Sequence, residues 1–269
     1  MSKTRFLGKL PFEPDSRDLL MAKYIDRAQL IEAAQVPGAL DWGAFPTPAG
    51  PQPEADTDPL YNDKAGCCVY AAPGHMVKLT GQLTGVPMVV TAGMVRDAYA
   101  AATGYDPATG ANDNGANIRD MLNQWRQSGL YETTIAAYCA VDWTNADEIA
   151  IAAWLCGGLI GGYNLPLASQ DQTDENDNPE WSVPAGGWPA NKGPGTWGGH
   201  CIYGHGTSPG LDEANSWGEP TVWTPGWRAA CCEELWAPVL GSWVMKSGRA
   251  PNGFAFADLL ADVQSRSQG

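Results

Sequence analysis

The sequence has few basic residues, and they do not cluster. Lys and Arg together number 16 in 269 residues, against 30 Asp and Glu, and the formal net charge is −14. A surface that binds nucleic acid needs grouped Lys and Arg to neutralise phosphates. The composition therefore argues against a nucleic-acid partner, and the acidity favours solubility.

Long apolar runs are missing as well. No window approaches the roughly 18 consecutive apolar residues of a transmembrane helix. The first 18 residues, MSKTRFLGKLPFEPDSRD, have a basic start but lack the apolar stretch of a secretory signal peptide. We therefore expect synthesis in the cytoplasm and no membrane partner.

The seven cysteines do not form a disulfide or zinc pattern. Their odd number, in a long chain without a signal, favours reduced thiols. Cys231 and Cys232 are adjacent, which is a poor match to C-x-x-C zinc spacing. The acidic stretch SQDQTDENDNPE does not match an EF-hand loop and is interpreted as solvated. No metal or cofactor is expected.

Hydrophobic periodicity divides the chain into two halves. Ile118, Met121, Leu122 and Trp125 recur at helical spacing, which predicts a helix within GANIRDMLNQWRQSGL. After Gly157, short apolar runs alternate with Gly, Pro and Asp, a pattern typical of short strands and turns. A mainly helical first half and a mainly β second half predict an α+β fold.

Three further local features are predicted. Asn145 is placed to cap a helix in NADEIAIAAWLCGG, and Asp15 or Ser16 to cap a partly helical segment near the N-terminus. Residues 68–84 also suit a helix. Pro73 is expected to kink or break that helix, because proline removes one backbone donor and clashes with the preceding turn.

A cysteine nucleophile needs a nearby base, and the base needs a group that orients it. Two adjacent cysteines, Cys67 and Cys68, precede an apolar run in NDKAGCCVYAA. His200 lies in WGGHCIYGHG and Asn215 in EANSWGE. Both fall within the roughly 130–150 residues downstream that papain-type enzymes use.

These motifs, in this order, resemble the papain-like cysteine peptidases, especially their bacterial and phage-type branch. AGCCVYAA is similar to the nucleophile motif, GGHCI to the histidine motif and ANSWGE to the asparagine motif. VPGALDWGAFPTP resembles the mature amino-terminus of the family, and DNGANIRDMLNQWRQSGL the segment that edges its substrate cleft. PFEPDSRD resembles a short leader motif, so the resemblance covers most of residues 8–245.

The resemblance implies a role for each matching residue. Cys68 takes the place of the nucleophile, His200 that of the base and Asn215 that of its orienter. Trp217 would shield the His–Asn bond from water, and Gly115 would offer its backbone to an extended substrate.

The chain departs from the family pattern near the nucleophile. Asn62 stands six residues before Cys68, where the family has a Gln that donates to the oxyanion, and its side chain is one methylene shorter. Ala65 replaces a cysteine, so the disulfide of the family at that point is absent. Val69 replaces the usual aromatic residue.

The resemblance also implies a papain-like two-lobed fold, with a helical lobe, a β-barrel-like lobe and the active-site cleft between them. We place an N-terminal extension at 1–35, the helical lobe at 36–145, the β-rich lobe at 146–248 and a tail at 249–269. The extension is expected to pack on the body, with trimming as the alternative.

A thiol at a helix N-terminus beside an imidazolium has a lowered pKa, so a thiolate–imidazolium pair is expected. The implied activity is hydrolysis of peptide or isopeptide bonds in a peptide or protein substrate, through an acyl-enzyme and without a cofactor. One alternative is an inactive relative that serves as a structural or binding protein in a virion or assembly. The other is an amidase or transamidase on the same triad.

The remaining His and Cys residues have simpler interpretations. His75 is expected to pack on the helix that follows the nucleophile, and His205 to lie at a strand end. Cys67 is expected to fill space, and Cys139 and Cys156 to be buried thiols.

Overall fold

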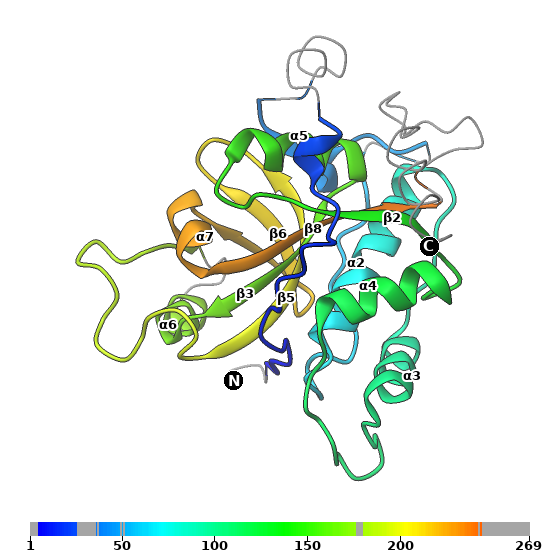
Figure 1. Cartoon of the computed structure of the whole chain (residues 1–269), viewed down its shortest axis with the longest axis horizontal. Helices are drawn as coiled ribbons and strands as arrows, with labels where there is room; N and C mark the ends of the chain where they lie inside the picture. The colour runs from blue at the N-terminus through cyan, green and yellow to red at the C-terminus, as the bar shows by residue number, and fades with distance from the viewer. Residues whose placement is uncertain are drawn as a thin grey trace.

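The computed structural model describes residues 5–25, 36, 38–48, 50, 52–175, 180–241 and 243. These residues form a helical lobe and a β-rich lobe that lie side by side (Figure 1). The α+β, two-lobed fold predicted from the sequence is confirmed. The tail placed at 249–269 lies outside the described residues.

Helix α2, Cys68–Leu83, is buried along nearly its whole length. The break predicted at Pro73 is not found, because the helix continues through it. Next to the proline, Gly74 lies so close to Leu60 and Val90 that an added Cβ would be 2.8 and 3.2 Å from their side chains. Burial of nearly the whole helix offsets the roughly 3 kcal/mol that an interior proline costs a helix.

Two other helices follow their sequence signals. In α4, Ile118–Gln127, the four predicted core residues are fully buried. In α5, Ala146–Cys156, the Asn145 side chain accepts from the Glu148 N–H at 3.3 Å, so the predicted cap is confirmed. Helix α3, Ala92–Thr103, completes the helical lobe beside α2.

The β-rich lobe is one eight-stranded sheet. Its strands are β1 (Leu40–Asp41), β2 (Ile135–Ala140), β3 (Leu159–Leu165), β4 (Glu180–Trp181), β5 (Gly198–Thr207), β6 (Asp212–Ser216), β7 (Glu219–Trp223) and β8 (Cys232–Leu240). Their order is β2-β8-β3-β5-β6-β7-β4, with β1 also paired to β5. Within the described residues the two ends of this path do not pair, so the lobe predicted as barrel-like is an open sheet.

Tryptophans fill the space between the sheet and its short helices, α6 (Leu167–Glu175) and α7 (Pro225–Cys231). The ring of Trp181 lies 6.1 Å from that of Trp223 and 5.0 Å from that of Trp227. The edge of Trp217 meets Trp181 at 6.5 Å, so this aromatic core extends to the surface that faces the helical lobe. It gives Trp217 a rigid support.

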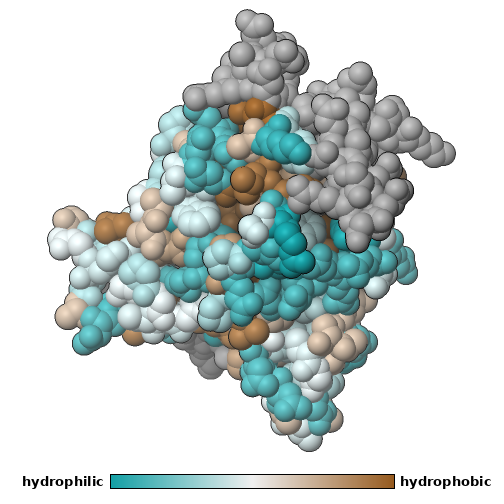
Figure 2. Space-filling model, viewed as in Figure 1, coloured by the Kyte–Doolittle hydropathy of each residue, from teal (hydrophilic) through white to brown (hydrophobic). Residues whose placement is uncertain are grey.

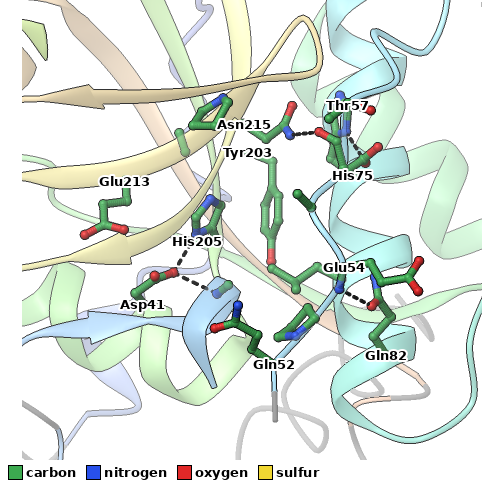
Figure 3. Close-up of a pocket in the computed structure, with 17 residues that line it drawn as sticks. Asp41, Gln52, Glu54, Thr57, His75, Gln82, Tyr203, His205, Glu213 and Asn215 are labelled. Atoms are coloured by element: carbon green, nitrogen blue, oxygen red, sulfur yellow. Dashed lines mark hydrogen bonds and ion pairs between the residues drawn. The ribbon is translucent and has the colours of Figure 1, made fainter. Parts of the chain in front are cut away.

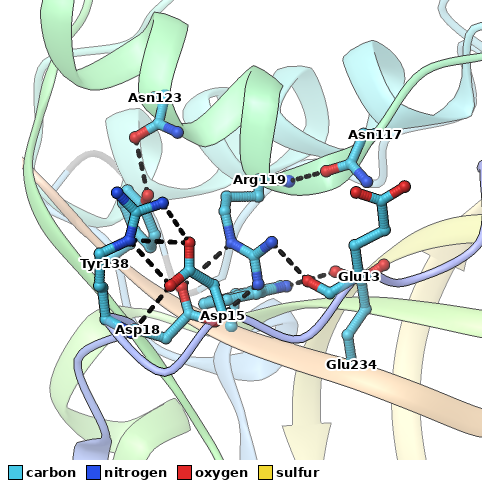
Figure 4. Close-up of polar contacts among 10 residues, drawn as sticks. Glu13, Asp15, Asp18, Asn117, Arg119, Asn123, Tyr138 and Glu234 are labelled. Atoms are coloured by element: carbon cyan, nitrogen blue, oxygen red, sulfur yellow. Dashed lines mark hydrogen bonds and ion pairs between the residues drawn. The ribbon is translucent and has the colours of Figure 1, made fainter.

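The N-terminal segment packs across both lobes. Two nitrogens of Arg119 donate to Asp18 at 2.6 and 3.0 Å, and a third donates to the Glu13 carbonyl (Figure 4). The Asp15 side chain accepts from the Arg17 N–H in a turn before the 3₁₀ helix η1, Met21–Lys23. Residues 26–35, where the helical prediction continued, lie outside the described residues.

Polar residues cover most of the face drawn in Figure 2, with an apolar patch near its upper centre. Across the described ranges, none of the helices combines the length and apolar character needed to span a bilayer.

A buried ion pair ties α7 to the sheet. Arg228 contacts Asp212 of β6, and their side chains are each 6% exposed. The same carboxylate accepts from Trp223 Nε1 at 2.9 Å and from Thr207 Oγ1 at 2.7 Å. Removing one partner would leave the other charge buried without compensation.

We expect Arg228→Ala to lower the free energy of unfolding by about 3–5 kcal/mol, because it leaves Asp212 as an unpaired buried charge. Urea unfolding followed by tryptophan fluorescence measures this. Arg17→Ala is the matched control, because its pair with Asp15 is at the surface, where solvent screens it, and its loss is expected to leave the free energy of unfolding nearly unchanged. Equal losses in the two variants would contradict the assignment.

Candidate active site

Cys68 is the first residue of α2, and it is 1% exposed. The backbone amides of Cys201 and Gly8 act on its sulfur and favour the thiolate. The thiol of the preceding residue, Cys67, instead points to the carbonyl of Leu60 at 3.8 Å. Of the two adjacent cysteines, Cys68 is therefore the one that faces β5 and the N-terminal segment.

His200 lies on β5, the strand that packs against α2. Its ring is stacked on Trp217, with 4.0 Å between centroids and 11° between planes. Nε2 is bonded to Ser216 Oγ at 2.8 Å. Nδ1 is buried and has no hydrogen-bond partner among the described residues, so one ring nitrogen is free for chemistry.

Asn215 does not contact His200 through a hydrogen bond. Its Nδ2 donates to the carbonyl of Asp56 at 2.6 Å, on the other side of the sheet. The register explains this, because Asn215 pairs with Tyr203, three residues from His200 on the same strand. Side chains alternate along a strand, so Asn215 and His200 point to opposite faces and Ser216 points to His200.

On that opposite face Asn215 lines a cavity of about 350 Å³ (Figure 3). His75 and His205 line it too, and each pairs with a carboxylate. His75 Nδ1 lies 2.7 Å from Asp56, and His205 Nδ1 lies 3.0 Å from Asp41. Both histidines are thus held by structural contacts away from Cys68.

The N-terminal residues Phe6–Leu10, here called the cleft segment, lie over the candidate site. The Lys9 N–H donates to the Gly199 carbonyl at 3.1 Å, and the Leu10 N–H donates to the Ala116 carbonyl at 2.9 Å. The Ala116 N–H in turn donates to the Gly8 carbonyl at 2.8 Å. The segment runs parallel to the chain at Ala116 and bridges the two lobes.

Asn62 and Trp217 converge on one carbonyl of the cleft segment. Asn62 Nδ2 donates to the Phe6 carbonyl at 3.2 Å, and Trp217 Nε1 donates to the same oxygen at 3.1 Å. Asn62 also donates to the Ala65 carbonyl at 3.0 Å, which fixes its amide. The shorter side chain at position 62 therefore still reaches a peptide carbonyl in the cleft.

Glycines let the backbones approach this closely. An added Cβ at Gly115 would overlap the Gly8 carbonyl, and one at Gly199 would overlap the Lys9 carbonyl. Gly115 also has φ of +77°, which side chains rarely adopt. The Gly115 N–H donates to the Tyr99 hydroxyl. The backbone that hydrogen-bonds to the cleft segment is therefore that of the next residue, Ala116.

Burial controls the charge state of the covered site. It raises the pKa of Cys68 to about 11, although the N–H groups of Cys201 and Gly8 and the charge of Lys9 act in the opposite direction. Burial also lowers the pKa of His200 to about 3, with a smaller contribution from His75. The covered site therefore holds a neutral thiol and a neutral imidazole, because desolvation outweighs the helix N-terminus.

The remaining cysteines, including Cys67, Cys139 and Cys156, are buried and form no disulfide. Within the described residues, no three His, Cys, Asp or Glu side chains are grouped so as to hold a metal ion.

Gly8→Ala is expected to displace the cleft segment, because the new Cβ would overlap the carbonyl of Gly66. Water would then reach Cys68 and lower its pKa from about 11. We expect alkylation of Cys68 by iodoacetamide at neutral pH to accelerate about tenfold or more. Peptide mass spectrometry across a pH series measures the rate, which in the wild type keeps rising towards pH 11.

Gly210→Ala is the control, since nothing lies within 4 Å of its added Cβ. If Cys68 reacts at the same rate in the wild type and in both variants, the cleft segment does not control access to the thiol.

No known family model and no curated sequence matches the chain. Solved structures do resemble it. Xylellain, a cysteine protease from Xylella fastidiosa, has a TM-score of 0.61 at 14% identity, over 88% of this chain and 96% of that chain. A recombinant stem bromelain precursor has a TM-score of 0.53 at 12% identity, over 88% and 78%.

Procathepsin B S9 from Trypanosoma congolense has a TM-score of 0.52 at 10% identity, over 89% of this chain and 87% of that chain. At these identities a likeness concerns the fold. The chain has the fold of the papain-like cysteine proteases, as its motifs predicted.

Proposed function

We propose that the protein is a cysteine peptidase in which Cys68 is the nucleophile and His200 the base. The papain-like fold supports peptidase activity in general. The position of Cys68 at the start of α2, against the strand that carries His200, supports this particular pair. With this pair, Cys68 supplies the attacking sulfur and His200 accepts and donates each proton that the reaction transfers.

In the proposed reaction, His200 takes the thiol proton and the sulfur attacks the carbonyl carbon of the substrate. The C–N bond breaks as His200 gives its proton to the leaving amine, and a thioester remains on Cys68. Water then attacks the thioester while His200 takes a proton from it. The C–S bond breaks, which releases a carboxylic acid and restores the thiol.

One observation carries this proposal. An extended peptide of the chain itself lies over Cys68, and backbone hydrogen bonds from both lobes hold it there. Asn62 Nδ2 and Trp217 Nε1 both donate to a carbonyl of that peptide. We infer that the same two donors serve substrate carbonyls, with Asn62 in the role of oxyanion donor.

Activity on another chain requires the cleft segment to leave or to be cut. Its departure would rehydrate Cys68 and His200, which raises the pKa of the imidazole and lowers that of the thiol. A thiolate–imidazolium pair then becomes accessible, as the sequence predicted for an active enzyme.

A non-catalytic binding protein is the second candidate. The observation that favours it is the burial of both side chains, each 1% exposed, which raises the pKa of Cys68 to about 11 and lowers that of His200 to about 3. A thiol in that state is a poor nucleophile at neutral pH.

Full-length protein carrying Gly8→Ala is expected to hydrolyse fluorescently labelled casein, and Cys68→Ala in that background to abolish hydrolysis. Cys67→Ala is the matched control and is expected to retain it, because its thiol faces Leu60. Mass spectrometry of the products, with added hydroxylamine, separates hydrolysis from transfer to an amine. Hydrolysis that persists in Cys68→Ala, or that is absent from every variant, would rule out the proposed nucleophile.

Ser216 and Asn215 are rival orienting groups for His200, and a pair of variants separates them. Ser216 Oγ bonds to His200, so we expect Ser216→Ala to reduce kcat roughly 10²-fold through misplacement of the ring. Asn215→Ala should change kcat less, since its amide bonds to Asp56. A larger loss in Asn215→Ala would instead favour the Cys-His-Asn triad that the resemblance implies.

A further inference from the structure

The side chain of Lys9 is completely buried in the β-rich lobe, at 0% exposure. Its Nζ pairs with Glu233 and lies 3.4 Å from Glu234 Oε1. It also donates to the Leu10 carbonyl at 2.8 Å. The neighbouring Leu10 is by contrast 42% exposed, so the buried member of the cleft segment is the charged one.

Strands β3 and β8 shape the space that Lys9 fills. Gly162 of β3 gives room for the stem, because an added Cβ there would overlap Lys9 Cε and lie 2.6 Å from Glu234 Cγ. Asn164 Nδ2 donates to Glu233 Oε2 at 2.5 Å and fixes that carboxylate. We call Gly162, Asn164, Glu233 and Glu234 the Lys9 pocket.

The charge of Lys9 balances the two carboxylates of the pocket. Glu234 is 1% exposed, and its Oε2 accepts from Trp236 Nε1 at 2.7 Å. Its Oε1 faces Lys9 but has no hydrogen-bond partner among the described residues. Burial raises the pKa of Glu234, and the Lys9 charge acts in the opposite direction. When Lys9 leaves, Glu234 loses the positive charge that compensates its burial, and the partly exposed Glu233 loses its ion pair.

The pocket lies next to the proposed nucleophile. The Lys9 N–H donates to the Gly199 carbonyl, next to His200. The preceding Gly8 packs against Gly66, two residues before Cys68, and its amide acts on the Cys68 sulfur. The residue whose side chain fills the pocket is therefore the neighbour, along the peptide, of the residue that lies over Cys68. The walls that bind the side chain are the same whichever way a peptide runs through the cleft.

We propose that the Lys9 pocket is a specificity site, and that the substrates of this protein are peptides that place a Lys or Arg side chain in it. This inference rests on the proposed peptidase function. Lys9 occupies the pocket as a built-in ligand until a substrate replaces it. Anchoring of the cleft segment alone would not require a buried charge, since an apolar side chain fills such a space at less desolvation cost.

Binding without catalysis gives the first test. Full-length protein with Gly8→Ala and Cys68→Ala is titrated into a labelled peptide of the sequence RFLGKLPF, and anisotropy gives the dissociation constant. The comparison peptide has norleucine, which keeps the stem without the charge, in place of the lysine. We expect the lysine peptide to bind at least about tenfold more tightly, and Glu234→Gln to remove most of that difference.

Gly162→Ala narrows the pocket without changing its charge, and should weaken both peptides together. It and Glu233→Gln also keep the comparison informative if Glu234→Gln does not fold. Glu180→Gln is the matched control, because Glu180 is an exposed carboxylate of the same lobe.

The second test reads cleavage. Full-length Gly8→Ala protein is incubated with a peptide library, and mass spectrometry identifies the cut bonds. We expect Lys or Arg at one fixed position relative to the cut, with the preference lost in Glu234→Gln. Cleavage without a basic preference, or equal affinity for the lysine and norleucine peptides, overturns the specificity site. A lysine preference in binding without any cleavage keeps the site and overturns the peptidase.

Discussion

A close contact between backbones organises this molecule. The cleft segment, Phe6–Leu10, passes between the two lobes at points where Gly66, Gly115 and Gly199 carry no side chain. Hydrogen bonds from Ala116 on one side and to Gly199 on the other fix its register. That register determines which amide meets the Cys68 sulfur and which side chain enters the sheet.

The electrostatics of the site follow from this contact. By excluding water, the segment removes the solvation that a thiolate and an imidazolium need, which favours the neutral forms of Cys68 and His200. The same segment carries Lys9, and the carboxylates of Glu233 and Glu234 balance its positive charge. Covering the nucleophile and filling the acidic pocket are thus two consequences of one docking event, and displacing the segment would reverse both.

Much of the fold could be predicted from the sequence, because its signals are local. The spacing of apolar residues in α4 and the cap at Asn145 depend on a few neighbouring residues. The order of the Cys, His and Asn motifs was enough to indicate the papain-like fold. The continuous helix through Pro73 was not predictable, since it depends on burial of α2 by segments remote in sequence.

The finer geometry of the site depends on contacts between distant parts of the chain. The register between β6 and β5 determines whether Asn215 or Ser216 faces His200, and the sequence motif does not contain that register. Lys9 is the one charged residue in the apolar stretch FLGKLPF, and its sequence gives no signal for burial of that charge against β8. The pKa of Cys68 was expected to fall because the helix N-terminus is a local feature. The desolvation that raises it comes from Gly8 and from β5, which are remote in sequence.

Hydrogen exchange combined with covalent capture tests the central claim most directly, namely that the cleft segment occupies the path of the substrate. The full-length protein would be treated with a lysine-containing peptidyl epoxide, and exchange of the Lys9, Leu10 and Ile160 amides compared before and after. The account predicts an adduct on Cys68, with protection lost at Lys9 and Leu10 and kept at Ile160 in β3. An adduct on Cys68 that leaves Lys9 and Leu10 fully protected would contradict it.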